Sequence, residues 1–186
     1  ILIGITTESD TKIWSLSEMT NVFLSPASIL FLLILLALAI GLTIICIILK
    51  YRKADILLGI SSGIFASFGA IFSKAFMTGF DNRVGGGFIF ALTSIAWWVF
   101  FIGLLVGNAG SLVEQQIGFQ KGKGVVLISI FNVVTVMIPS LSGVIMFGEW
   151  NALDPSTITL KLISYSVLSI GIVLLSIFTQ KSNVSI

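Results

Sequence analysis

Residues 26–49, PASILFLLILLALAIGLTIICIIL, form an apolar run without a single charged side chain. A transmembrane helix needs about 20 mostly apolar residues, so this run is long enough to cross a bilayer once. Of the 186 residues, 56% are hydrophobic and 10% are charged, whereas about 25% are charged in a typical soluble domain. Length and composition together predict an all-α membrane protein.

Four further stretches of similar character are predicted to span the membrane. The connections between them are short, which predicts one compact five-helix bundle over residues 26–180. Residues 1–25 are predicted to be an extracytoplasmic segment, and residues 181–186 a tail. The longest connection, between residues 107 and 124, holds Glu114 and two glutamines. The four further predicted crossings are about 56–79, 85–107, 124–148 and 157–179.

Basic residues predict the orientation of the bundle, because cytoplasmic loops are enriched in lysine and arginine. The basic residues lie in every second connection of the predicted bundle. Every second connection lies on the same side of the membrane, so these residues share one side. We therefore expect a multi-pass protein of a cell or organelle membrane, with its N-terminal segment outside and its C-terminus in the cytoplasm. These residues are Lys50, Arg52, Lys53, Lys121, Lys123 and Lys181.

The segment before the first crossing is too polar to span the membrane. Its second half predicts a short amphipathic helix at the interface, with Trp14, Met19 and Phe23 on one face. Ser15 followed by Glu18 is typical of a capping box. The first residue is Ile1 rather than methionine. We expect the chain to be part of a longer protein, with residues 1–5 ending an upstream helix.

Composition excludes several classes of chemistry. Histidine is absent and Cys46 is the only cysteine, which removes disulfides, thiolate–imidazole metal sites and histidine-based nucleophilic catalysis. No paired carboxylates are predicted within the membrane, so we expect no enzyme and no cofactor, and no metal-ligand set is defined. A net charge of only +2 argues against nucleic acid as a partner.

The second predicted crossing carries a stripe of small residues that includes Gly59, Ser62 and Gly63. Small residues at this spacing allow two helix backbones to approach closely. The stripe therefore forms either a tight helix–helix seam or the wall of a substrate cavity. Both interpretations stay open, and the second makes Ser62 and Gly63 candidates for a substrate pathway.

The fourth predicted crossing carries Ser129, Asn132, Thr135 and Pro139 on or beside one face. Pro139 cannot donate a hydrogen bond to the carbonyl of Thr135 and is expected to loosen the helix there. A free carbonyl at membrane depth is tolerated only beside protein or a water-filled cavity. The cluster is either part of a substrate pathway or a packing kink with interhelical hydrogen bonds.

The same crossing ends in SGVIMFGEW, residues 142–150, where a carboxylate follows a long apolar run. At a helix C-terminus the dipole disfavours the charge of Glu149 by a few tenths to about 1 kcal/mol. We expect water or a cation to offset this cost, and Lys74, Lys161 and Arg83 are the candidates for an ion pair at the outer mouth. Gly148 is expected to let the chain leave the helix.

Three motifs in the same order resemble the drug/metabolite transporter superfamily, of the EamA-like type. Residues 118–150, GFQKGKGVVLISIFNVVTVMIPSLSGVIMFGEW, resemble its last helices, with a mid-span proline and a terminal Gly-Glu. Residues 59–76, GISSGIFASFGAIFSKAF, resemble a helix of its five-helix unit. Residues 15–26, SLSEMTNVFLSP, with MFGEW, are similar to its NIPA-type, magnesium-transporter-like branch.

This resemblance implies a ten-helix transporter built from two inverted five-helix repeats, of which this chain would be the C-terminal half. The partner would be the missing N-terminal half or a second five-helix chain. The pathway positions carried over are Asn132, Pro139 and the Gly148–Glu149 end, and Gln115 and Gln116 near the cytoplasmic side. No carboxylate is predicted at mid-membrane here, so a proton- or cation-coupling acid is expected in the other half.

Two functions remain as hypotheses. The first is a half-transporter that moves a small solute or a divalent cation such as magnesium by alternating access. The second is a scaffold or assembly subunit that transports nothing. The two differ in whether the fourth crossing faces water.

Overall fold

The computed structural model describes residues 14–81, 87–150 and 153–182, and every regular element in these ranges is a helix. Within them, α3, α4, α6 and α7 are long and apolar enough to cross a membrane, which indicates a membrane-embedded protein. The fifth predicted crossing coincides with α8, and that it spans the bilayer stays a prediction. The helices are α2 (Leu16–Leu24), α3 (Pro26–Ile48), α4 (Ala54–Met77), α5 (Gly87–Thr93), α6 (Ile95–Lys121), α7 (Gly124–Ile145) and α8 (Pro155–Ser182), with a 3₁₀ turn, η1 (Thr78–Phe80), after α4.

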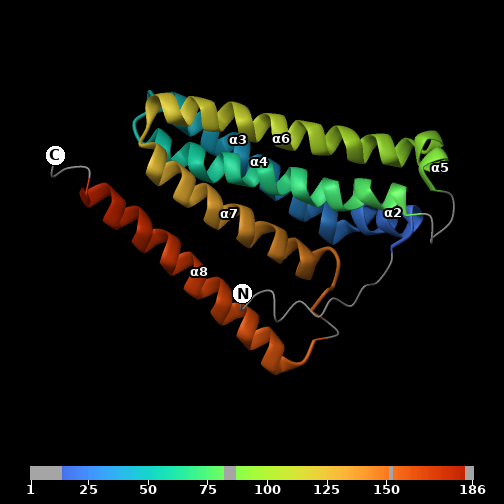
Figure 1. The fold of residues 1–186 in the computed structure, drawn as a ribbon. Helices are drawn as coiled ribbons and strands as arrows, with labels where there is room; N and C mark the ends of the chain where they lie inside the picture. The colour runs from blue at the N-terminus through green and yellow to red at the C-terminus, as the bar shows by residue number, and fades with distance from the viewer. Residues whose placement is uncertain (1–13, 82–86, 151–152, 183–186) are drawn as a thin grey trace.

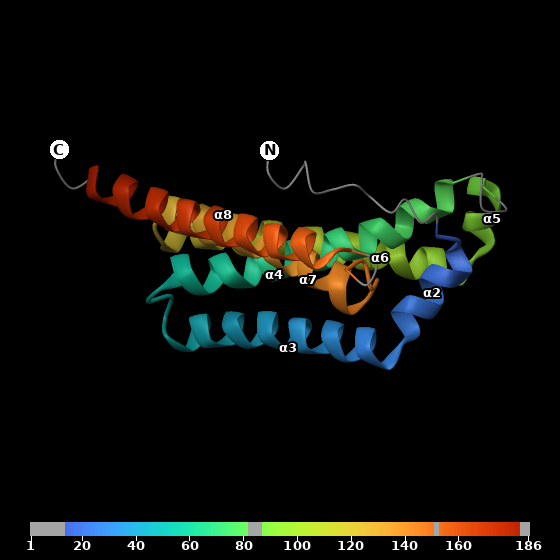
Figure 2. The ribbon, with the colours of Figure 1, turned by 90° about the horizontal axis from the view of Figure 1, so that it is seen from below.

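Helix α4 lies at the centre of the bundle, between α6 and α7, and packs mainly against these two and α3 (Figure 1). Helices α3 and α8 lie at opposite sides (Figure 2). The small residues of α4 explain its position. A Cβ atom on Gly59 would lie 3.1 Å from the carbonyl oxygen of Leu127 on α7, and one on Gly63 would lie 2.7 Å from the Cβ of Val134. The stripe predicted from the sequence is thus a helix–helix seam with α7.

The turns that join α3 to α4 and α6 to α7 lie at the same end of the bundle (Figure 1). A Cβ atom on Gly122 would lie 2.6 Å from the amide nitrogen of Asp55. The Lys121 ammonium lies 5.9 Å from the centroid of the Tyr51 ring. The basic residues of these two connections therefore share one end, as the sequence predicts, and that this end is cytoplasmic stays a prediction.

Helix α2 packs against the opposite end of the bundle. The predicted capping box is confirmed: the Ser15 amide donates to Glu18 Oε2 at 2.9 Å, and the Glu18 amide donates to Ser15 Oγ at 3.2 Å. Met19 and Phe23 are buried, and the Phe23 ring lies 5.1 Å from that of Phe72. The apolar face predicted to lie at the membrane interface is instead covered by the bundle, because aromatic side chains of α4 and α6 surround it.

The boundaries predicted for the third crossing, about 85–107, are wrong. Residues 87–93 form the separate helix α5, Ser94 is extended, and α6 runs from Ile95 to Lys121. The segment 111–117, SLVEQQI, contains no glycine or proline, and leucine, glutamate and glutamine favour helix strongly enough to continue it. The connection between α6 and α7 therefore consists of Gly122 and Lys123 only. The polar residues at 114–116 belong to α6, which is long enough to cross the membrane.

Candidate functional site

Glu114 is a buried carboxyl inside α6, and its side chain lies among the helices of the bundle with only 6% of its surface exposed. It stands about two turns, or roughly 10 Å, before the end of α6. The sequence predicts a connection around Glu114, and this is wrong, because α6 continues through it. That no carboxylate lies at mid-membrane stays a prediction.

Two hydroxyl groups from two other helices surround this carboxyl. Thr43 Oγ1 of α3 is hydrogen-bonded to Glu114 Oε1. The Thr43 and Ser61 hydroxyl oxygens lie 3.0 Å apart, and each lies 3.0 Å from the carbonyl oxygen of Ala39. Ser61 of α4 is fully buried. Three helices that are long and apolar enough to cross a membrane thus contribute to one oxygen cluster, made of Ala39 O, Thr43 Oγ1, Ser61 Oγ and the Glu114 carboxyl.

The second carboxyl oxygen, Glu114 Oε2, is buried and has no hydrogen-bond partner in the described part of the chain. Buried polar groups almost always have a partner, and an exception calls for an explanation, such as a bound ion or a catalytic role. An unpartnered carboxylate oxygen is costly in an apolar surrounding. Glu114 Oε2 is therefore an acceptor that a proton or a positively charged ligand could use.

No cation compensates Glu114 among the described residues. Helices α3 and α7 contain no Asp, Glu, Lys or Arg, and α4 contains only Asp55 and Lys74, near its two ends. The Lys74 ammonium contacts Glu149 at the other end of the bundle. A buried charge without a counter-ion is strongly disfavoured, so the site favours a ligand that brings positive charge.

A signal for this site was present in the sequence. Thr43, Ser61 and Glu114 stand at similar distances, about two turns, from the connections at the basic end of the bundle. Thr43 and Ser61 interrupt otherwise apolar stretches of their helices. Once the helix is extended through Glu114, these three positions fall at one depth.

The polar residues predicted on the fourth crossing do not share one environment in α7. Ser129 is buried and donates to the carbonyl of Val125 at 2.8 Å. Thr135 and Pro139 are half-buried, and Asn132 is exposed, with an amide that forms no hydrogen bond to the described residues. Asn132 lies about 140° around α7 from Leu127 and from Met137, which contact α4 and α8. It therefore occupies a third face that neither helix covers.

The other predicted pathway residues are not gathered at one place. Ser62 and Gly63 are buried in the seam of α4 with α7. Gln115 donates to Ser111 Oγ on α6 at 3.1 Å, and Gln116 is exposed. Since α4 lies between α6 and α7 (Figure 1), the two glutamines are separated from Asn132 and its neighbours.

Lys74 and Glu149 form an ion pair at the end of the bundle opposite the basic turns. The Lys74 ammonium also lies 3.9 Å from the centroid of the Phe147 ring. Gly148 has a φ of 61°, which lets the chain leave the helix in the predicted way. Of the three predicted cations, Lys74 is the one that meets Glu149. Lys161 forms no ion pair with the described residues, and Arg83 lies outside them.

Replacing Lys74 by alanine is expected to lower the free energy of unfolding more than Glu149→Gln does. The lysine contacts both a carboxylate and an aromatic ring, whereas Glu149→Gln removes only the ion pair. Both side chains are substantially exposed, at 40% and 49%, so each change should cost less than about 1 kcal/mol. Thermal unfolding in detergent measures this, with Lys161→Ala as control. Equal losses for the two variants would contradict the contribution of Phe147.

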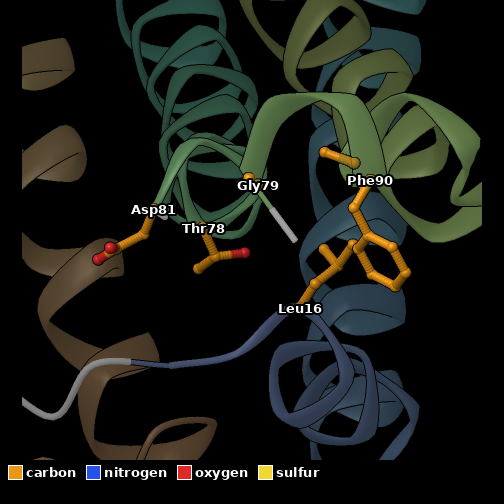
Figure 3. A pocket seen from close by; sticks show the side chains of 7 residues that line it. Leu16, Thr78, Gly79, Asp81 and Phe90 are labelled. Atoms are coloured by element: carbon orange, nitrogen blue, oxygen red, sulfur yellow. The ribbon is translucent and has the colours of Figure 1, made fainter. Parts of the chain in front are cut away.

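Two hollows in the described structure do not coincide with Glu114. A pocket between α2, η1 and α5 is lined by Leu16, Thr78, Gly79, Asp81 and Phe90 (Figure 3), and its volume of about 10 Å³ admits no more than a water molecule. A groove of about 360 Å³ runs between α7 and α8 and is lined mostly by apolar side chains. The hydroxyl groups in the groove belong to Ser140, Tyr165, Ser166 and Ser169, and no charged side chain lines it.

Comparison of the chain with protein-family models, with curated proteins and with solved structures finds no match.

Proposed function

We propose that the chain is one half of a membrane transporter, which moves a small solute or a divalent cation such as magnesium by alternating access. The other half would be an N-terminal five-helix repeat or a second five-helix chain. Together they would form the ten-helix, two-repeat architecture of the drug/metabolite transporter superfamily that the sequence resembles.

The buried carboxyl of Glu114 carries this proposal. Ionisable groups inside membrane helices are costly, and where they occur they mark ion pathways, proton relays or ligand sites. A scaffold needs no such group, because apolar side chains would pack the same helices at lower cost. The uncovered polar face of α7 at Asn132 agrees with a pathway, since an unpaired amide is disfavoured in lipid.

Flux measurements test the proposal. The full-length protein, reconstituted into proteoliposomes, is expected to move Mg²⁺ or at least one of a panel of small metabolites faster than empty vesicles do. Equal flux with and without protein for every solute tested would contradict it and favour the scaffold hypothesis.

The α7 face can be tested separately by cysteine labelling. In a Cys46→Ser background, Asn132→Cys is expected to react with a membrane-impermeant thiol reagent, while Leu127→Cys, in the α4 contact, stays unreactive. A protected cysteine at both positions would mean that this face of α7 is dry.

Asn132→Ala is expected to lower solute flux about tenfold, the equivalent of one lost hydrogen bond to solute or water, without reducing membrane insertion. Pro139→Ala is expected to lower flux as well, by restoring a continuous helix through the pathway. Ile128→Ala is the control, because Ile128 is an exposed apolar residue one turn from Asn132. Wild-type flux in both test variants would leave α7 with a packing role only.

A further inference from the structure

The oxygen cluster around Glu114 holds too few protons when the carboxyl is ionised. Four oxygen–oxygen contacts at hydrogen-bonding distance link Ala39 O, Thr43 Oγ1, Ser61 Oγ and Glu114 Oε1. The two hydroxyl groups supply only one proton each. Two contacts are then left without a proton of their own, and Glu114 Oε2 has no donor at all.

One additional proton on the carboxyl resolves most of this deficit. A protonated Glu114 donates to Thr43 Oγ1, Thr43 donates to Ser61 Oγ, and Ser61 donates to the carbonyl of Ala39. Hydroxyl groups rotate freely to allow this direction, since either oxygen of the Thr43–Ser61 contact can be the donor. The oxygen left without a donor then belongs to a neutral acid, whose burial costs far less than that of a carboxylate.

We propose that Glu114 is a proton-binding site, and that its proton is the ion that drives solute movement. The first part stands on the geometry of the cluster, and the coupling part rests on the proposed transport function. The carboxyl lies roughly 10 Å, or two helical turns, from the basic end of the bundle, so a small change in the contacts of α3, α4 and α6 would expose it to water there. Binding and release of the proton would then alternate with movement of the helices.

The same oxygens suit a metal ion less well. Mg²⁺ requires near-octahedral coordination and usually binds through one or two carboxylates together with several waters. Only one carboxyl is present here, and no group of three or more Cys, Asp or Glu residues occurs in the described structure.

Few other titratable groups face the site. On α3 the only one is Cys46, which is fully buried three residues beyond Thr43. Helix α4 contributes Asp55 near its first residue and Lys74 near its last, and α6 contributes Lys121 at its end. Helix α7 contributes none. A pH-dependent signal from within the bundle can therefore come from Glu114 or Cys46. In the Cys46→Ser variant it can be assigned to Glu114 alone.

Carbodiimide labelling of the full-length protein in lipid nanodiscs tests the proton site directly. N,N′-dicyclohexylcarbodiimide reacts with protonated carboxyls buried in apolar surroundings, as the O–H of the acid adds across a C=N bond. Peptide mass mapping is expected to find the label on Glu114, falling about tenfold for each pH unit above its half-maximal point. Glu149, an exposed and ion-paired carboxylate, serves as the internal control and should stay unlabelled.

Infrared difference spectra between acidic and alkaline pH supply a second readout. The part of the protonated-carboxyl band that persists to the highest pH is expected in the wild type and in Glu149→Gln, and is expected to be lost in Glu114→Gln. If Glu114→Gln fails to fold, labelling of the wild type still decides the matter. No label and no band at any pH would overturn the proposal, as would protection of Glu114 by Na⁺ or Mg²⁺ in the absence of a protonated-carboxyl band.

Transport failure and proton-site failure are distinguishable. Titratable labelling of Glu114 without flux in the wild type would overturn the transporter proposal and the coupling, and would leave the proton site standing. Flux that acidifies or alkalinises the vesicle lumen and falls at least about tenfold in Glu114→Gln would support the coupling. Flux unchanged in Glu114→Gln would overturn it.

Discussion

Gly107→Leu is expected to prevent α4 and α6 from packing and to leave little folded protein. A Cβ atom at this position would lie 2.7 Å from the Cα of Gly69 and 2.9 Å from the carbonyl oxygen of Phe65. These are backbone atoms, so no side-chain rotation relieves the clash, and the two helices must separate. We expect a loss of about 3 kcal/mol or more, measured by unfolding in mixed micelles, with aggregation visible in size-exclusion chromatography.

Gly41→Leu provides the matched control for this experiment. Gly41 also lies inside a long helix, α3, but a Cβ atom there meets nothing within 4 Å. Leucine at this position should be neutral or slightly stabilising, because it replaces the residue with the poorest helix propensity after proline. Stability of Gly107→Leu equal to that of Gly41→Leu would mean that α4 and α6 do not approach closely at Gly69.

Thr43→Val is expected to destabilise the protein by about 1–3 kcal/mol, because valine keeps the shape of threonine but removes the partner of the Glu114 carboxyl. In a Glu114→Leu background the same change should cost less than about 0.5 kcal/mol, because the remaining hydroxyl of Ser61 still donates to Ala39. The difference between the two backgrounds is the coupling energy between Thr43 and Glu114. Unfolding of the four variants in mixed micelles measures it.

Thr135→Val separates this effect from the general cost of removing a threonine hydroxyl. The hydroxyl of Thr135 donates only to carbonyls of its own helix, at 3.0 Å and 3.1 Å. Its loss should cost less than about 1 kcal/mol and should not depend on residue 114. A cost for Thr43→Val that is the same with glutamate or leucine at position 114 would contradict a direct interaction.

Most helix positions could be predicted from the sequence, because they depend on properties of contiguous residues. The apolar run at 26–49 became α3, and the runs at 56–79 and 124–148 became α4 and α7 with ends shifted by a few residues. The prediction failed at residues 108–121. There, low hydrophobicity predicts a connection, because hydrophobicity alone does not separate a polar segment of a helix from a polar loop.

The candidate site could not be predicted, because the sequence places Glu114 in a connection and because the site joins residues that are far apart in the chain. Glu114 meets Thr43 across 71 positions of sequence, and Lys74 meets Glu149 across 75. Such pairs depend on how each helix is rotated about its axis. The periodicity of a helix predicts which residues share a face, but not which neighbouring helix contacts that face.

By itself the sequence determined that this chain is a bundle of apolar helices, where its N-terminal cap lies and which of its ends carries the basic residues. These properties follow from segment length, local hydrogen bonding and the order of charges along the chain. Only the tertiary structure decided that α2 is buried against the bundle, that Lys74 is the cation at Glu149, and that the Glu114 carboxyl lies among α3, α4 and α6. Such features depend on how the helices are rotated against one another, which for α6 and α7 is restricted by their close approach to α4 at Gly59, Gly63 and Gly69.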